Sequence, residues 1–196
     1  IINEILTNPY SGGEDWVELY NNSDKFIDLF QWQFANYQSD TLSNFKSIDM
    51  HKIVEPGNFV VIGEDPNFVI ENYPNHDPET FIINDLPSYA NDSGTVVLLQ
   101  GSSIMDQVPY NDDWHLSVID DLNGVSLERI DPSGETDNSF NWHSAAQDIG
   151  FGTPGLENSQ FISAVYSGDF SFTNSIFSPD NDGYQDVLQV NYLLES

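Results

Sequence analysis

The most regular set of potential metal ligands in this 196-residue sequence lies in residues 178–189. Counting from Ser178, oxygen-bearing side chains stand at positions 1, 3, 5 and 9 of a twelve-residue loop, and glycine stands at position 6. Calcium-binding loops begin and turn in this way, but position 12 here is Gln189 instead of a bidentate glutamate. Two interpretations stay open: a weak calcium site of the extracellular kind, or a turn shaped by Asp and Gly. The predicted ligands are Ser178, Asp180, Asp182 and Asp186.

Pairs of adjacent carboxylates are weaker candidates for ion binding. Neighbouring side chains on a strand point to opposite faces, so each pair needs a loop to converge on one ion. The pairs are Glu14-Asp15, Glu64-Asp65, Asp112-Asp113 and Asp120-Asp121.

Aromatic residues beside one of these pairs are candidates for sugar binding, because stacking on a sugar ring needs flat side chains at a wet surface. Tyr110 and Trp114 flank Asp112 and Asp113, and these four residues form the predicted binding group. The alternative for aromatic residues is burial in the core. We expect burial for Trp16, Trp32 and Trp142.

Three glutamates in apolar surroundings, Glu4, Glu18 and Glu128, are the candidates for a catalytic carboxylate pair. Such a pair has its carboxyl groups about 5–10 Å apart in a cleft. The alternative is structural: a buried glutamate accepts hydrogen bonds from backbone donors or pairs with a cation, and Arg129 is the only arginine. We expect the structural role. The four histidines show no spacing that pairs two imidazoles on one element, and His143 is expected to be packed or at the surface.

The charge balance excludes several classes of partner. The chain has 32 Asp and Glu against 4 Lys and Arg, a formal net charge of −28. Nucleic-acid binding depends largely on Lys and Arg, so we expect no nucleic-acid partner. No apolar run approaches the roughly 20 residues of a membrane span, so we expect no membrane insertion. The absence of cysteine excludes disulfides, thiol catalysis and cysteine-bound zinc.

Short β-type runs separated by turn residues fill residues 1–160. In residues 16–20, Val17 and Leu19 point to one face of a strand, and Trp16 and Glu18 point to the other. Residues 59–63 and 95–100 are apolar and β-branched, as in strands buried on both faces. One short helix is expected after Asp65, with Pro66 at its first position. The pattern therefore predicts an all-β antiparallel sandwich.

New β-type runs begin at residue 161, and about 36 residues are too few to close a sandwich of roughly 100 residues. We therefore expect residues 1–160 to form one β-sandwich. Residues 161–196 are expected to be a linker and the first strands of a second β domain.

The order and spacing of several motifs over residues 1–160 resemble the bacterial lamin tail domain. The motifs are Ile2-Asn3-Glu4-Ile5, Asn8-Pro9, Asp15 to Asn21, Asp28-Leu29 with Trp32, Pro56-Gly57, Ser126-Leu127-Glu128-Arg129, Trp142, and Gly152-Thr153-Pro154-Gly155 with Asn158-Ser159. The resemblance implies an immunoglobulin-like β-sandwich that acts as a non-catalytic module of secreted and surface proteins.

Residues 177–188 resemble the start of the Ig-like repeats, of the flagellar-hook-capping type, in large surface proteins of Bacteroidota. This resemblance implies export by the type IX secretion system to the cell surface of a Gram-negative bacterium. Neither a signal peptide nor a sorting domain is recognised in the sequence, so export is inferred from the resemblance alone.

Together these observations predict a non-catalytic structural or interaction module of a large extracellular protein, with calcium as its candidate cofactor. Its expected partners are other domains or subunits of a surface assembly. A calcium-assisted glycan-binding module is the alternative, distinguished by whether Trp114 or Tyr110 is exposed beside the carboxylates. An acid-pair hydrolase is the third hypothesis.

Overall fold

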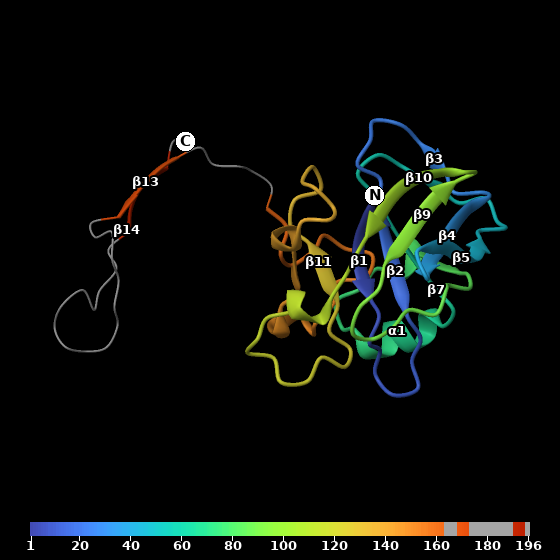
Figure 1. Cartoon of the computed structure of the whole chain (residues 1–196), viewed down its shortest axis with the longest axis horizontal. Helices are drawn as coiled ribbons and strands as arrows, with labels where there is room; N and C mark the ends of the chain where they lie inside the picture. The colour runs from blue at the N-terminus through green and yellow to red at the C-terminus, as the bar shows by residue number, and fades with distance from the viewer. Residues whose placement is uncertain (163–167, 173–189, 195–196) are drawn as a thin grey trace. The chain divides into compact units, whose positions relative to one another are not determined.

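The structure is a computed structural model that describes residues 1–162, 168–172 and 190–194 (Figure 1). Its internal contacts divide the chain into two units, Ile1–Phe161 and Ile162–Ser196. In the second unit, β13 (Gly168–Phe172) pairs antiparallel with β14 (Val190–Leu194). The interpretation of this unit as the start of an Ig-like domain stays a prediction.

The first unit contains two main sheets, and both were expected to be antiparallel. The larger sheet has six strands in the order β12 (Trp142–Ser144), β11 (Leu127–Arg129), β1 (Ile2–Leu6), β2 (Trp16–Tyr20), β7 (Phe59–Gly63) and β8 (Phe81–Ile83). The smaller sheet has the order β10 (Ser103–Val108), β9 (Val96–Gln100), β4 (Trp32–Gln38) and β5 (Thr41–Ser47). All neighbouring pairs are antiparallel except β7 with β8. This is the predicted immunoglobulin-like all-β sandwich.

The remaining elements of the first unit are short. A two-stranded ribbon joins β3 (Ile27–Asp28) to β6 (Ile53–Val54). The helical segments are α1 (Pro66–Asn72), η1 (Pro78–Thr80), η2 (Asp112–Trp114), η3 (Ser139–Asn141) and η4 (Gln147–Ile149). Asp65 caps α1 by accepting a hydrogen bond from the backbone N–H of Phe68 at 3.2 Å, as the sequence predicts.

The main apolar core lies between the inner faces of the sheets. The alternation in β2 directs Val17 and Leu19 into this core, where Phe34 and Leu98 of the smaller sheet also lie. Each of these side chains is at most 4% exposed. Complete burial of such a side chain stabilises a fold by about 2 kcal/mol. The predicted burial of Trp16, Trp32 and Trp142 is confirmed.

The outer face of the larger sheet is covered in two ways. Under α1, Trp16 of β2 packs with Val61 of β7 and with Val69 and Tyr73 of the helix region. Beside this apolar patch, residues 152–161, which we call the covering segment, hydrogen-bond to the glutamates of β1, β2 and β11. The sheet is therefore buried on both faces over its central strands.

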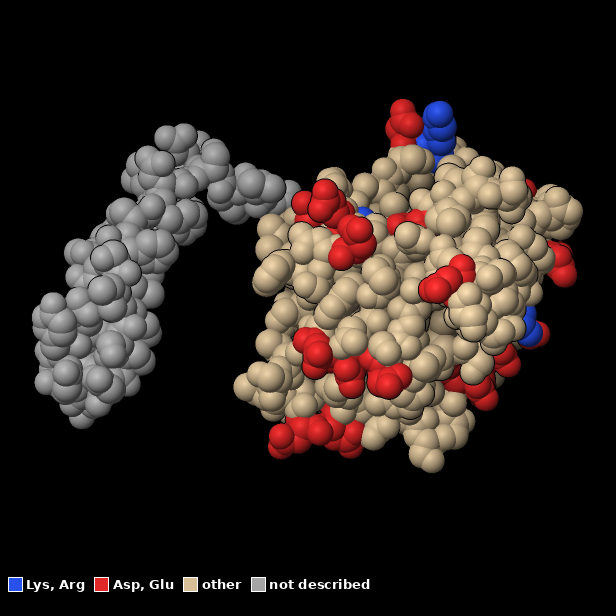
Figure 2. All heavy atoms as spheres, in the orientation of Figure 1, with Lys and Arg blue, Asp and Glu red and all other residues tan. Residues whose placement is uncertain are grey.

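The surface carries the acidity of the sequence. Figure 2 shows acidic side chains scattered over the visible face and very few basic ones. Of the four basic residues, Arg129 is buried, with 3% of its surface exposed. None of the helices in the described residues is long and apolar enough to span a membrane.

Candidate functional site

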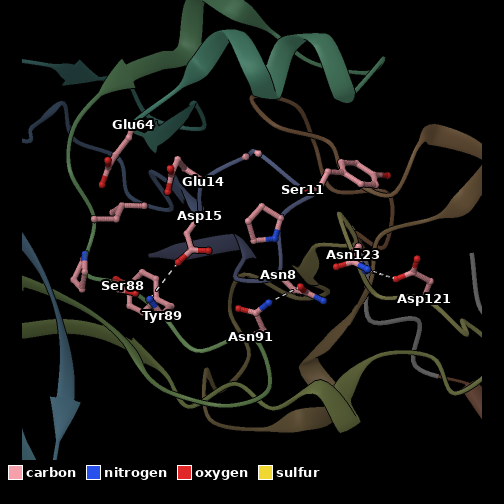
Figure 3. Close-up of a pocket in the computed structure, with 16 residues that line it drawn as sticks. Asn8, Ser11, Glu14, Asp15, Glu64, Ser88, Tyr89, Asn91, Asp121 and Asn123 are labelled. Carbon is pink, nitrogen blue, oxygen red and sulfur yellow. Dashed lines mark hydrogen bonds between the residues drawn. The ribbon is translucent and has the colours of Figure 1, made fainter.

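The first unit contains a polar hollow of about 680 Å³ (Figure 3). Its wall is built by loops at the ends of β1, β2 and β7 and by two more distant loops, 86–91 and 121–123. Three of the acidic pairs noted in the sequence contribute to it. The polar residues that line it include Asn8, Ser11, Glu14, Asp15, Glu64, Ser88, Asn91, Asp121 and Asn123.

Asp15 is a carboxyl group of this hollow with a strongly shifted pKa. Burial raises its pKa to about 7, and the negative charges of Glu14 and Glu64 add to the rise. The backbone N–H of Tyr89 donates to Oδ2 of Asp15 at 3.2 Å and opposes the rise. Asp15 therefore changes its charge close to neutral pH.

The amides of the hollow are partly engaged with the protein itself. Asn91 Nδ2 donates to Oδ1 of Asn8 at 2.7 Å, and Asn123 Nδ2 donates to Oδ1 of Asp121 at 2.5 Å. The remaining carboxylate and amide groups suit a ligand with hydroxyl or ammonium donors. Within the described residues, no group of three or more His, Asp and Glu side chains is arranged to hold a metal ion.

The three glutamates considered for catalysis form a row across the outer face of the larger sheet. Glu4 of β1 stands opposite Glu18 of β2 on one side and opposite Glu128 of β11 on the other. All three side chains are completely buried. We call this row the glutamate layer. Like charges directly opposite one another destabilise a sheet, so the row needs compensating donors.

Glu18 and Glu128 receive their donors largely from the covering segment. The backbone N–H of Gly155 donates to Oε2 of Glu18 at 2.6 Å. The backbone N–H of Gln160 donates to Oε2 of Glu128 at 2.9 Å, and the Ser159 hydroxyl donates to the same oxygen at 2.7 Å. On the sheet itself, the side-chain amide of Asn3 donates to Oε1 of Glu18 at 2.8 Å.

Glu4 binds the start of the covering segment. Its Oε1 accepts the backbone N–H of Thr153 at 3.0 Å and the hydroxyl of Ser126. The Thr153 hydroxyl lies 2.8 Å from Oε1 of Glu128 and 3.3 Å from Oε2 of Glu4. One hydroxyl proton serves only one of these oxygens, so a second proton on a carboxyl group is needed for both contacts to be hydrogen bonds.

Burial raises the pKa of Glu18 to about 8, against the donors Asn3 and Gly155. Burial also raises the pKa of Glu4 well above its usual range, and the charges of Glu128 and Glu18 add to it. Desolvation disfavours the charged form of each carboxyl group. Glu4 and Glu18 therefore hold protons more tightly than exposed glutamates do.

Arg129 does not neutralise the glutamate layer. Its Nη1 donates to Oδ2 of Asp106 at 3.2 Å and to the backbone oxygen of Ile2 at 3.2 Å, and its Nη2 donates to the backbone oxygen of Gly134 at 2.7 Å. The guanidinium thus ties β11 to β10 at the edge of the sandwich. The glutamates were expected either to pair with this cation or to accept backbone donors, and the structure has the second arrangement.

The predicted sugar-binding group is not assembled as a platform. Tyr110 is only 3% exposed, and its hydroxyl donates to the backbone oxygen of Ala90 at 2.6 Å. Trp114 is partly buried and packs against the main core, while Asp112 and Asp113 are exposed in η2. Tyr110 is therefore not available to stack on a sugar ring, because it belongs to the main core together with Val108. The predicted calcium ligands, Ser178, Asp180, Asp182 and Asp186, lie outside the described residues.

The polar hollow was missed as a unit at the level of the sequence. The acidic pairs were noticed one by one. Nothing in the sequence indicates that the loops containing Glu64 and Asp121 lie next to the loop before β2. The turn-forming residues 7–13 before Asp15 were the available signal, since binding residues often lie on such loops. His115 was also not singled out from the sequence as a group with a shifted pKa. In the structure, burial lowers its pKa to about 4.

Comparison with known protein families matches residues 1–112 to a family described as Lamin Tail Domain. The match covers more than half of the 196-residue chain and runs from β1 to the start of η2. Comparison with curated proteins finds no match. The covering segment and β11 lie beyond the matched residues, although both hydrogen-bond to β1.

Proposed function

This chain belongs to the Lamin Tail Domain family, and from that premise we propose that it is a non-catalytic structural and interaction module of a large extracellular bacterial protein. The family is an Ig-like structural fold. The observation that carries the proposal is that Glu4, Glu18 and Glu128 are completely buried and bound by donors of the chain itself. Carboxylates used in this way hold the fold together and do not face a substrate.

The non-catalytic role is tested with the whole chain on a panel of chromogenic glycosides and soluble polysaccharides. We expect no turnover above the blank, and we expect Glu18→Gln and Glu128→Gln to lower the melting temperature. Turnover that disappears in these two variants while the fold is retained would overturn the proposal.

Calcium stabilisation and surface location belong to the same proposal. The oxygen ligands spaced through Ser178–Asp186 support a weak calcium site, and the resemblance of residues 177–188 supports a place in a Bacteroidota surface protein exported by type IX secretion. Other domains or subunits of that assembly are the proposed partners. A rise in melting temperature at millimolar calcium, lost in Asp180→Asn with Asp182→Asn, is the expected result.

Glycan binding is a second candidate function, and the polar hollow is the observation that favours it. This hollow of about 680 Å³, lined by amides, hydroxyls and carboxylates, suits an oligosaccharide. The predicted group around Tyr110 suits one less well, because Tyr110 is buried. Titration of the whole chain with oligosaccharides tests it, with Asp15→Asn as the variant expected to weaken binding. Equal heats of binding for the natural chain and the variant would exclude this hollow as the glycan site.

A further inference from the structure

Two adjoining cavities flank the covering segment at the end of the larger sheet. One is a small pocket of about 90 Å³, and the other is an open groove of about 420 Å³. They share Gly57, Phe59 and Glu157 in their walls. Because three residues belong to both, a single extended ligand is able to occupy them together. We call the pair the terminal groove.

The small pocket is lined by aromatic side chains. Tyr20 at the end of β2 and Phe59 at the start of β7 are cross-strand partners whose rings stack with centroids 4.9 Å apart. Phe161, at the end of the covering segment, and Pro132 complete the apolar wall. A water molecule takes about 30 Å³, so the pocket holds a group of roughly three non-hydrogen atoms. Rings of this kind attract a cation through their quadrupole.

The groove next to it is acidic. Its wall includes carboxylates from the ribbon, from η1 and from the covering segment, and a single lysine. These residues are Glu55, Asp77, Glu79, Glu157 and Lys52. Lys52 donates to the backbone oxygen of Glu79 at 3.3 Å, so its ammonium group is directed to the wall of the groove. A cationic ligand therefore meets an excess of negative charge.

The terminal groove is preformed, because the fold fixes the covering segment between the two cavities. Gly155 is bonded to Glu18 through its backbone N–H, and the backbone N–H of Asp77 donates to the backbone oxygen of Pro154 at 3.0 Å. Asn158 donates to the backbone oxygens of Asn3 and Arg129. A site that is rigid before binding avoids much of the cost of ordering it.

We propose that the terminal groove binds a basic peptide segment of a partner protein, with the end of a lysine side chain in the aromatic pocket and its ammonium group beside Glu157. Further cationic side chains of the peptide lie along Glu55, Asp77 and Glu79. The inference rests on the proposed function and names the chemistry of the partner. The net charge of −28 attracts such a segment from a distance, and the rings select a lysine at one position.

The test uses the whole chain and fluorescein-labelled ten-residue peptides in which glycine and lysine alternate, measured by fluorescence anisotropy at physiological salt. A peptide with norleucine in place of each lysine keeps the length of the side chain and removes the charge. We expect the lysine peptide to bind and the norleucine peptide not to bind. Phe161→Ala is expected to weaken binding about tenfold, as the loss of a cation–π contact predicts.

Two matched variants control for general electrostatic attraction. Glu157→Gln should weaken binding severalfold, whereas Glu71→Gln, which removes an equal charge from the exposed surface of α1, should change it less than twofold. Phe140→Ala removes a ring that is 89% exposed and lies outside both cavities. Near-ultraviolet circular dichroism confirms the fold of each variant. Equal effects of Phe161→Ala and Phe140→Ala, or no binding by the folded chain, would overturn the proposal that the terminal groove binds a basic peptide. Either result would leave the proposed structural role of the chain intact.

Discussion

The outer face of the larger sheet is covered by two neighbouring regions that use different chemistry. Under α1, the contact is apolar and centres on Trp16, which packs edge-on against Tyr73 with ring centroids 5.7 Å apart. Under the covering segment, the contact is made by the buried carboxyl groups of the glutamate layer. Trp16 and Glu18 are only two residues apart on the same face of β2.

The difference shows how a segment without regular structure is held on a sheet. A helix presents an apolar side that packs on apolar side chains, because its backbone groups are already hydrogen-bonded within it. An irregular segment has free backbone N–H groups, and these need acceptors when they are buried. The glutamates supply acceptors for the backbone N–H groups of the covering segment, whereas the helix needs no such acceptors from the sheet.

The largest expected effect comes from removing the covering segment. A chain shortened to residues 1–112, the length of the family match, lacks β11 and the donors of the glutamate layer. We expect it to show no cooperative thermal unfolding by circular dichroism, since Glu4 would lose the strand beside it and the segment above it. A chain of residues 1–161 should unfold cooperatively. Equal unfolding curves for the two chains would contradict this account.

The next largest expected effect is a loss of unfolding free energy in the apolar contact under α1. Trp16→Ala removes a completely buried ring beneath α1, and such a change costs about 4 kcal/mol of unfolding free energy. Urea unfolding measures the loss. Phe26→Ala, at a ring that is 66% exposed, should change the unfolding free energy by less than about 0.5 kcal/mol. Similar losses in the two variants would show that Trp16 does not anchor the helix.

The corresponding change on the polar side is Glu18→Ala. It leaves the N–H groups of Asn3 and Gly155 without their acceptor, and each unsatisfied buried donor costs about 1–3 kcal/mol. We expect a loss of about 3 kcal/mol in urea unfolding. Glu14→Ala, at an exposed glutamate four residues earlier, serves as the matched control and should be nearly neutral. A neutral result for Glu18→Ala would mean that the glutamate layer does not hold the segment.

The smallest effect is a dependence on pH. The pKa of Asp15 is raised by burial from 3.8 to about 7, so its contribution to stability is complete below pH 4 and is lost as the pH rises through 7. Asp15→Asn should therefore unfold at higher urea than the natural chain at pH 8, and the advantage should shrink toward pH 5.

His115 should act in the opposite direction. Its pKa is lowered by burial from 6.5 to about 4, so the stability it contributes is complete above pH 6.5 and is lost as the pH falls through 4. Replacing it with glutamine should flatten the fall in stability between pH 6.5 and 4, measured by urea unfolding. An unchanged slope in His115→Gln would show that the imidazole is free to take up a proton in the folded chain.

The sequence predicts the apolar half of this structure well. Alternation in residues 16–20 placed Val17 and Leu19 in the core and Trp16 on the other face, and Asp65-Pro66 marked the start of α1. These predictions succeed because they depend on local spacing. The structural role of Glu18 was also expected, since a glutamate between apolar neighbours needs buried donors.

The partners of that glutamate were beyond the sequence. One donor to Glu18 comes from Gly155, 137 residues away, and no local pattern connects the two. Tyr110 shows the same limit, because it directly precedes an acidic loop and yet its ring lies in the core. Loop residues are placed by the tertiary structure, so sites built from several loops are the least predictable part.

Native-state hydrogen exchange of the Gly155 amide tests the central claim, that the glutamate layer fixes the covering segment to the sheet. We predict that this amide exchanges only through global unfolding, as slowly as the amides of β2, and that Glu18→Ala makes it exchange much faster while β2 stays protected. A Gly155 amide that exchanges in the natural chain at the rate of an exposed loop amide would contradict the claim.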